Sequence, residues 1–434
     1  MYSFTLFSQE IEMVGQDEVT YATLIGIDWA DQKHDYCLGV ADTATPEAGV
    51  IESSPEAVNA WVNQLRKRFQ GHKIAICLEQ AKGALIHQLM AVEFIDLYPL
   101  NPQALANYRK AFTVSQAKDD PTDAQLLWEY LAKHRNRLRV WTLENVNTRK
   151  LALLVEDRRK MLDLRTKLSN KLTAALKGYF PQALKLIGAQ VTCAMACDFL
   201  QRWTSLSQIK RCRDHTIQTF YTQHYIRDHE KIQRRLNLIR TSVPLVEDQA
   251  IVETSILKVK ALSRQIACLN EDIGEYDRRI ANLFESHPES ELFQSLPGAG
   301  KALAPRLLVA LGTDRERFRQ ADEVATFSGI APVTDRSGKH TWVRWRLACP
   351  KFLRQTFHEF ANMSRHQSSW ANAYYEMQRH RGKSHHAALR SLAFKWIRII
   401  YRCWKQREIY DEAEYLKALV KRNSPLIEFM AKAA

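Results

Sequence analysis

The sequence predicts an α/β domain at the N-terminus, followed by an all-α remainder. Two strand-like apolar runs come first, and helix-like and strand-like segments then alternate as far as about residue 140. From about residue 145 to 285 the chain has few helix breakers and carries apolar residues at helical spacing. This order of segments is typical of a mixed sheet covered by helices and joined to a helical region.

Apolar runs, helix caps and prolines give the order of elements in the N-terminal domain, 22–140. Residues 1–21 are expected to form a loose extension ahead of it. Strands are expected over 23–29, 34–40, 50–51, 73–78 and 94–98. Helices are expected from Ser54 to Phe69, over 84–92, from Pro102 onward and over 120–132. Hairpin strands followed by helix–strand units predict a mixed sheet.

The region 145–285 is expected to contain two long helices, over 148–177 and 253–284. Helices with this periodicity form antiparallel or intermolecular coiled-coil arms, so we expect a linker and dimerisation region. The breaker-rich stretch "SHPES" ends the second helix. A mainly helical C-terminal domain is expected over 291–405, with a helical tail at 406–434.

The composition is that of a globular protein, with 434 residues of which 46% are hydrophobic and 25% charged. The sequence shows no secretory leader and no uninterrupted apolar stretch of about 18 residues. Its eight cysteines are scattered, which suits reduced thiols better than a disulfide framework. We therefore expect a cytoplasmic protein that does not bind a membrane.

The net charge of +14 is concentrated in one stretch, the basic region (336–407). It holds 16 Lys or Arg residues against two acids, so its own net charge is +14 and the rest of the chain is close to neutral. Five of the ten tryptophans also lie there. Interleaved basic and aromatic residues favour a nucleic-acid surface. The alternative is a set of solvated helix faces over a tryptophan-rich core.

Four carboxylates stand at strand ends and at a helix start in the N-terminal domain. Asp28 interrupts the apolar run of the first strand, and Glu79 directly follows "KIAICL". Asp120 and Asp123 are three residues apart at a helix start, so they share one face. Acids gathered in this way repel each other unless a hard cation lies between them, and oxygen ligands suit Mg²⁺ or Mn²⁺. Such a site can hold and polarise a phosphodiester.

Each of these acids also has a purely structural interpretation. An Asp at a strand end is often a turn residue, and "DDPTD" is a good N-cap sequence. Asp119 competes with Asp120 as a ligand, but only Asp120 has the three-residue spacing to Asp123. We expect Asp119 to face solvent or the loop. The order of the four acids on matching elements favours the metal site.

The C-terminal domain contains a glycine-bearing turn, "LPGAGK", which includes Gly298, Gly300 and Lys301. It is similar to the hairpin of helix-hairpin-helix modules, whose backbone N–H groups bind DNA phosphates. It is not a P-loop, because the GxxxxGK[ST] spacing is missing. The alternative is an ordinary helix–helix turn.

Ser337 is expected in a loop, within a group of cations. Its neighbours in the sequence are Arg336, Lys339, His340, Arg344 and Arg346. Ser-Gly is common turn chemistry, which is the plain interpretation. As a nucleophile, the serine needs its hydroxyl made more acidic, and surrounding cations do this electrostatically.

Three cysteines and a histidine form a loose zinc-like pattern in the helical region: Cys193, Cys197, Cys212 and His215. The first pair is separated by three residues, where a zinc knuckle most often has two. The sequence therefore favours cysteines in a helical core.

Together these motifs resemble those of the DEDD-type insertion-sequence transposases, the bacterial group numbered one hundred and ten, whose relatives are the Piv-type invertases. The resemblance covers about residues 22–135 and 290–375. "GIDWADQKHD", "CLEQAKG" and "KDDPTDA" match the family's Asp, Glu, Asp, Asp pattern. "LPGAGKALAPRLL" and "ATFSGIAPVTDRSGK" match its C-terminal turn and its serine motif.

The resemblance implies a RuvC-like, ribonuclease-H-type domain in which Asp28, Glu79, Asp120 and Asp123 bind Mg²⁺ or Mn²⁺. It implies that Ser337 of one subunit attacks a DNA phosphodiester, forms a phosphoserine link and works with the acids of another subunit. It also implies dimers pairing into tetramers, a Holliday junction, nucleoid association and, in many members, a structured bridge RNA. The expected nucleic-acid contacts are Gly298, Gly300, Lys301, Arg336, Lys339, Arg344, Arg346 and Arg354.

Three other functions fit parts of the sequence. A structure-specific nuclease similar to a Holliday-junction resolvase needs only the four acids. An actin-like or sugar-kinase ATPase also begins with "GID", but it needs a Gly/Ser/Thr-rich hairpin where this chain has "WADQKHD". A non-catalytic scaffold predicts that Asp28→Asn and Glu79→Gln leave every activity intact. The sequence favours a site-specific DNA recombinase.

Overall fold

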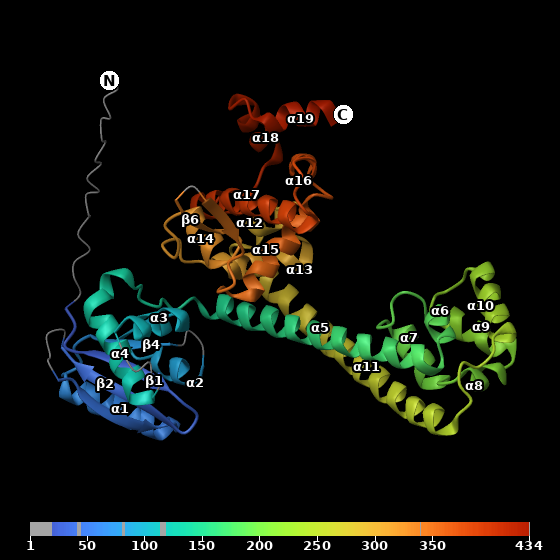
Figure 1. Ribbon diagram of the computed structural model, residues 1–434, viewed down its shortest axis with the longest axis horizontal. Coiled ribbons are helices and arrows are strands. Elements are labelled where there is room, and N and C mark those ends of the chain that lie inside the picture. The colour runs from blue at the N-terminus through green and yellow to red at the C-terminus, as the bar shows by residue number, and fades with distance from the viewer. Residues whose placement is uncertain (1–19, 41–44, 80–82, 113–118, 339, 434) are drawn as a thin grey trace. The chain divides into compact units, whose positions relative to one another are not determined.

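The computed structural model describes residues 20–40, 45–79, 83–112, 119–338 and 340–433 (Figure 1). Most of the expected N-terminal extension, and Lys339 among the expected contacts, lie outside these residues. The chain divides into two compact units, Met1–Leu143 and Glu144–Ala434. Each unit is described by itself.

The first unit is built on a five-stranded mixed sheet, as the sequence predicts. Its strands are β1 (Leu24–Trp29), β2 (Lys33–Gly39), β3 (Glu47–Glu52), β4 (Ile74–Leu78) and β5 (Ile95–Pro99), in the order β3-β2-β1-β4-β5. Strands β1, β2 and β3 pair antiparallel, whereas β4 is parallel to both β1 and β5. The third strand is longer than the two residues expected.

Helices cover both faces of this sheet (Figure 1). They are α1 (Pro55–Arg68), α2 (Ala84–Leu89), α3 (Pro102–Phe112) and α4 (Asp120–His134), followed by a 3₁₀ turn at Arg135–Arg137. The predicted cap of α1 is confirmed, because the Ser54 hydroxyl accepts a hydrogen bond from the Ala57 N–H. Pro102 begins α3 as expected.

Strand β4 is buried along its whole length, between two apolar clusters. Ile74, Ile76 and Leu78 pack with α1 and α2, whereas Ala75 and Cys77 pack with α3 and α4. This alternation follows from the two-residue repeat of a strand. Every second residue of the central strands therefore faces α4.

The second unit contains two long helices, α5 (Val146–Tyr179) and α11 (Gln249–Glu285), which lie side by side (Figure 1). Val155 near the start of α5 shares an apolar cluster with Ile280 near the end of α11. Leu172 in the second half of α5 shares another cluster with Val259 near the start of α11. The two helices therefore pack antiparallel within one chain, which was one of the two arrangements expected.

In the sequence, the two long helices are separated by an inserted helical subdomain (182–241). Its helices are α6 (Gln182–Ile187), α7 (Ala194–Arg202), α8 (Leu206–Lys210), α9 (Asp214–Gln223) and α10 (His229–Thr241). Phe199, Trp203 and Phe220 form an aromatic cluster in its core. Cys197 is buried in the same core. The subdomain therefore has an apolar core that it shares with the adjoining halves of α5 and α11.

The remaining elements form a helical body with one β-hairpin. They are α12 (Ser290–Gln294), α13 (Gly300–Leu311), α14 (Ala321–Phe327), β6 (Val333–Ser337), β7 (His340–Arg344), α15 (Lys351–Ser364), α16 (Ser369–His380), α17 (His385–Gln406), α18 (Glu412–Lys421) and α19 (Pro425–Ala433). The expectation of a loop around Ser337 is wrong, because this stretch pairs as an antiparallel hairpin. No helix in the described residues is both long and apolar enough to span a membrane.

The tryptophans of the basic region divide between core and surface. Trp370, Trp396 and Trp404 are fully buried in the core of the helical body. Trp342 and Trp345 on and beside the hairpin are 54% and 44% exposed. The tryptophan-rich core therefore exists, and two tryptophans remain available at the surface.

Candidate active site and nucleic-acid interface

Asp28 and Glu79 lie at the same edge and on the same face of the first unit's sheet. Ile27 of β1 is in register with Leu78 of β4. Asp28 follows Ile27 within β1, and Glu79 directly follows the last residue of β4. Leu24 is four residues before Asp28, and Cys77 is two residues before Glu79. Both pack in the apolar cluster under α4. Both acids therefore continue the sheet face that α4 covers.

Helix α4 runs antiparallel to β1, so that it starts near the Asp28 end of the strand. Gly26 faces the helix so closely that a Cβ atom there would collide with the carbonyl oxygen of Ala124 and the backbone nitrogen of Trp128. The Trp128 indole donates a hydrogen bond of 3.2 Å to the carbonyl of Gly39, which pairs with Leu24 at the far end of β1. The first turn of α4 therefore lies toward the two strand acids.

The three acids at the start of α4 differ in their surroundings. Asp123 is 2% exposed, and its carboxylate accepts hydrogen bonds from the Arg109 guanidinium of α3, with 2.8 Å from Nε to Oδ1. Asp120 is half-buried. Asp119 is exposed and caps the helix, because its carboxylate accepts a hydrogen bond from the Thr122 N–H at 2.9 Å. Hydrogen bonding with Thr122 lowers the pKa of Asp119. Asp119 therefore faces solvent as expected.

The predicted ligands do not form a metal-binding group among the described residues. No three His, Cys, Asp or Glu side chains in the described residues are grouped closely enough to hold a metal ion. Asp123 is already paired with Arg109. The donors nevertheless fit a hard cation in kind, since all of them are carboxylates that approach from two strand ends and one helix start. Their role as ligands remains a prediction.

A further acid of this face was missed by sequence reasoning. Asp35 of β2 is directly opposite Asp28 in the antiparallel register, and it is only 4% exposed. Its Oδ2 lies 3.1 Å from the Lys33 ammonium nitrogen. The available signal is the two-residue alternation of β2, which places Asp35 on the same face as buried Cys37. Two carboxylates therefore oppose each other across neighbouring strands.

Ser337 is the last residue of β6, at the tip of an exposed hairpin. It pairs with His340 across the turn that Gly338 opens with a φ of +56°. Cross-strand partners share a face, so Ser337 and His340 lie on the same side of the hairpin as Asp335 and its partner Trp342. No hydrogen bond joins the Ser337 hydroxyl to another residue in the described part of the chain.

The cations expected around Ser337 are only partly gathered there. Arg336 is adjacent in sequence, so it projects from the opposite face of the strand. Arg344 shares the serine's face, but its guanidinium is ion-paired with Asp335. Arg346 lies beyond the hairpin and lines a pocket. His340 is therefore the described side chain that the register places next to the serine.

The glycine turn before α13 is partly used by the fold itself. Gly298 has a φ of +80°, and a Cβ there would come within 2.7–2.8 Å of the backbone of Met363 and Ser364. Its N–H donates to the Gln367 side chain at 2.9 Å, so this N–H is not available to a phosphate. Gly300 and Lys301 are exposed at the start of α13, where no side chain of the described residues caps the helix.

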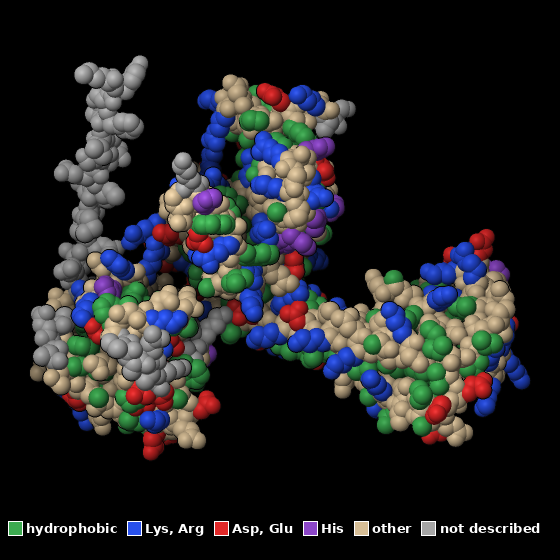
Figure 2. Space-filling view, in the orientation of Figure 1, with side chains coloured by type: hydrophobic (Ala, Val, Ile, Leu, Met, Phe, Trp, Pro, Cys, Tyr) green, Lys and Arg blue, Asp and Glu red, His purple; other side chains and the backbone are tan. Residues whose placement is uncertain are grey.

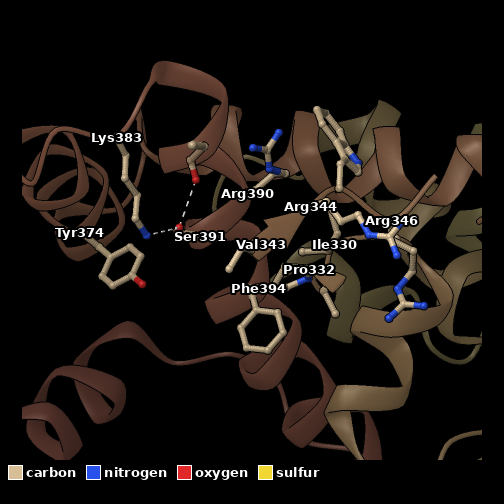
Figure 3. Close-up of a pocket in the computed structure, with 14 residues that line it drawn as sticks. Ile330, Pro332, Val343, Arg344, Arg346, Tyr374, Lys383, Arg390, Ser391 and Phe394 are labelled. Atoms are coloured by element: carbon tan, nitrogen blue, oxygen red, sulfur yellow. Dashed lines mark hydrogen bonds between the residues drawn. The ribbon is translucent and has the colours of Figure 1, made fainter. Parts of the chain in front are cut away.

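Basic side chains gather on the helical body, and Figure 2 shows Lys and Arg over its visible face. A pocket at the base of the hairpin is lined by Arg344, Arg346, Lys383 and Arg390 (Figure 3). The Arg354 guanidinium donates to the Arg346 carbonyl at 3.1 Å and lies over the Trp345 ring. Arg354 therefore supports the segment that follows the hairpin.

The three cysteines of the loose zinc-like pattern pack in the helical core, whereas His215 is exposed. Cys197 is buried, and the Trp203 indole donates to the Cys212 sulfur at 3.0 Å. These contacts agree with the interpretation of the cysteines as residues of a helical core.

A mixed sheet with acids at the ends of two neighbouring strands, in one chain with a basic helical body, suits an enzyme that acts on nucleic acid. Two family models match the chain and narrow this class to a DNA transposase or recombinase. A DEDD transposase model of the IS110 type matches residues 25–181, and the model "Transposase IS116/IS110/IS902 family" matches residues 290–376. The chain belongs to the DEDD transposases of the IS110 family.

Curated relatives extend the similarity over nearly the whole chain. A candidate transposase of the IS117 mini-circle from Streptomyces coelicolor is 26% identical over 93% of this chain and 99% of its own length. An uncharacterized 43.6 kDa protein of insertion element IS110 from the same species is 25% identical over 76% and 77%. The pilin gene-inverting protein of Moraxella bovis is 31% identical over 22% of this chain and 30% of its own.

Proposed function

We propose that this transposase is a site-specific DNA recombinase that moves an insertion sequence through a covalent phosphoserine intermediate. The observation that carries the proposal is the position of Ser337, exposed at the tip of a hairpin beside His340. A nucleophile must reach a phosphodiester in a large substrate, and a protruding hairpin tip suits that need. Its family membership supports the same chemistry.

The proposed reaction is a transesterification. The Ser337 oxygen attacks the phosphorus, its proton passes to a base, and a new Oγ–P bond replaces the bond to one nucleotide. That nucleotide leaves with its hydroxyl oxygen, which takes up a proton. A hydroxyl of another strand then attacks the phosphoserine and releases the serine, so that the number of phosphodiester bonds is conserved.

The proposed role of the acids is to hold the phosphodiester through a cation. Mg²⁺ or Mn²⁺ bound by Asp28, Glu79, Asp120 and Asp123 would neutralise charge on the phosphate and polarise it. For this, the Asp123 carboxylate must be shared with Arg109 or released from it. We place the acids and the serine of one active site on different subunits, in dimers that pair into tetramers and resolve a Holliday junction.

The proposed nucleic-acid partners are the DNA of the element ends and target and a structured guide RNA. The contacts are assigned to Gly300, Lys301, Arg336, Lys339, Arg344, Arg346 and Arg354, with Gly298 shaping the turn rather than donating to phosphate. The localised charge of the basic region supports this assignment. Binding should weaken steeply with salt, because counterions are released from the nucleic acid.

One substitution tests the proposal against its alternative. Full-length protein is incubated with DNA of the element junction, and covalent protein–DNA adducts are counted on a denaturing gel. Ser337→Ala should remove both the adduct and strand exchange while DNA binding persists. Unchanged cleavage by Ser337→Ala, without an adduct in the wild type, would instead identify a metal-dependent nuclease that needs only the acids.

A further inference from the structure

A pocket of about 480 Å³ lies at the base of the β6–β7 hairpin (Figure 3). Its lining comes from residues 329–332 before the hairpin, from 343–346 at its end, and from α17 and the residues just before that helix. Tyr374 of α16 contributes from the side. This volume is within the range of small-molecule sites, and it fits one nucleotide better than a duplex surface.

The pocket carries positive charge that the described residues do not compensate. Of its four cations, only Arg344 has a carboxylate partner among the described residues, the Asp335 side chain. Within the described part of the chain, Arg346, Lys383 and Arg390 have no carboxylate partner, and no Asp or Glu contributes to the lining. The Arg346 Nε atom is buried, and no hydrogen-bond partner for it lies among the described residues. Such a set is complementary to a phosphate group.

Between the cations lies an apolar wall. Ile330, Pro332, Val343 and Phe394 lie together in Figure 3, with Lys383 on one side and the arginines on the other. Aromatic and apolar side chains of this kind accept the flat face of a nucleobase whatever its sequence. A charged rim around an apolar wall therefore matches a nucleotide, which has one charged and one flat part.

The Arg390 guanidinium is held in place before any ligand arrives. Its Cζ atom lies 4.1 Å from the centroid of the Trp345 ring, and Arg354 lies over the same ring at 5.2 Å. The Lys383 ammonium donates to the Ser391 hydroxyl at 2.9 Å. These contacts reduce the rotational freedom that the two cations would lose on binding an anion.

The hairpin connects this pocket to the proposed nucleophile. Val333 pairs with Arg344 at the base of the hairpin, and Ser337 stands four residues further along β6. Four strand residues span about 13 Å. This length corresponds to about four base-pair steps of DNA at roughly 3.4 Å each. A strand whose phosphodiester lies at Ser337 therefore has nucleotides within reach of the pocket.

We propose that this pocket binds one unpaired nucleotide of the DNA strand that Ser337 attacks, a few nucleotides from the reacting phosphodiester. The base packs against Phe394 and the apolar wall, and Arg346, Lys383 and Arg390 bind its phosphates. The site rests on the proposed function, since it assigns the pocket to the recombining strand. Extruding a nucleotide would fix the register of the strand on the hairpin.

The test compares two DNA duplexes of about 30 base pairs that differ by one unpaired 2-aminopurine nucleotide bulged from one strand. Full-length wild-type protein should bind the bulged duplex about tenfold more tightly, since stacking one base on aromatic side chains is typically worth a factor of ten or so. The fluorescence of the bulged base should change on binding. Equal affinity for both duplexes overturns the proposal.

Matched variants assign any preference to the pocket. Phe394→Leu keeps an apolar side chain and the fold but removes the ring, and Arg390→Gln removes a phosphate contact. Each should reduce the preference to about twofold while affinity for the paired duplex stays nearly constant. Arg402→Ala, an exposed cation of α17 outside the pocket, should leave the preference intact. A preference that survives both pocket variants overturns the proposal.

Two further comparisons distinguish a DNA ligand from an RNA ligand, and the pocket proposal from the phosphoserine proposal. A duplex with an RNA bulge of the same sequence is compared with the DNA bulge, and a stronger preference for the RNA bulge would contradict the assignment to DNA. The adduct assay with Ser337→Ala is read separately. Loss of the bulge preference leaves the phosphoserine proposal standing, and an adduct that persists in Ser337→Ala overturns that proposal alone.

Discussion

The Arg109 guanidinium of α3 donates to the buried carboxylate of Asp123 on α4, a predicted metal ligand. Both side chains are largely buried, so the pair compensates a negative charge that would otherwise be isolated. The arginine therefore holds the position that a cation would share. It links the stability of the first unit to the proposed metal site.

We predict that Arg109→Gln destabilises the metal-free protein and makes it more responsive to Mg²⁺. Removing one partner of a buried ion pair costs about 3 kcal/mol of unfolding free energy. Mg²⁺ should raise the thermal midpoint of this variant more than that of the wild type, as scanning fluorimetry with and without EDTA would show. Lys110→Gln, the exposed neighbour on α3, should match the wild type. If Mg²⁺ raises the thermal midpoint of Arg109→Gln and of the wild type equally, Asp123 does not bind the metal.

We predict that Asp28→Asn and Glu79→Gln each lower recombination by at least about 100-fold, since even outer-shell changes at metal sites cost about 10–100-fold. Gel-shift affinity for DNA should stay within about twofold of the wild type. Asp119→Asn serves as the matched control, because this exposed acid caps α4. Full activity in both variants would favour a non-catalytic scaffold.

The elements of the first unit could be predicted because each is a short run with a clear local signal. Ser54 caps α1, and the five apolar residues of β4 mark a buried strand. Residues 333–344 lack such a signal, since both hairpin strands are largely exposed and show no alternation of apolar residues. A hairpin without a buried face has no alternation of apolar residues, so hydrophobic periodicity cannot predict it.

The sequence predicts which residue types form the candidate site, but it does not predict which other residues these acids contact. The position of Asp35 opposite Asp28 depends on the register of two strands, and the bond from Arg109 to Asp123 joins two helices. Neither relationship leaves a fixed spacing in the sequence. The Gly298 N–H was expected to be available to DNA, but Gln367, far along the chain, accepts its hydrogen bond.

We predict that the helical body loses stability as the pH falls below about 6.5. Burial lowers the pKa of His358, and the nearby His386, Arg390 and His385 lower it further. Because the unfolded histidine has a pKa near 6.5, the unfolded chain then binds more protons, so stability is complete above that pH and declines below it. Urea midpoints at pH 8.0, 6.5 and 5.5 measure the decline.

His358→Gln should reduce this pH dependence, since its amide does not titrate. His366→Gln is the control, because His366 is exposed on the turn that follows α15. A pH dependence that is the same in wild type and His358→Gln would assign the effect to other groups.

We predict that His340 assists the proton transfer from Ser337, because the two residues are cross-strand partners at the hairpin tip. The His340 ring also stacks on Trp342, with 6.0 Å between centroids, which limits its rotation. His340→Gln should slow adduct formation by about 100-fold, the usual scale of general base catalysis, while DNA binding persists. Thr341→Ala, on the opposite face, should keep the wild-type rate of adduct formation. A wild-type rate in His340→Gln would exclude His340 from the proton transfer.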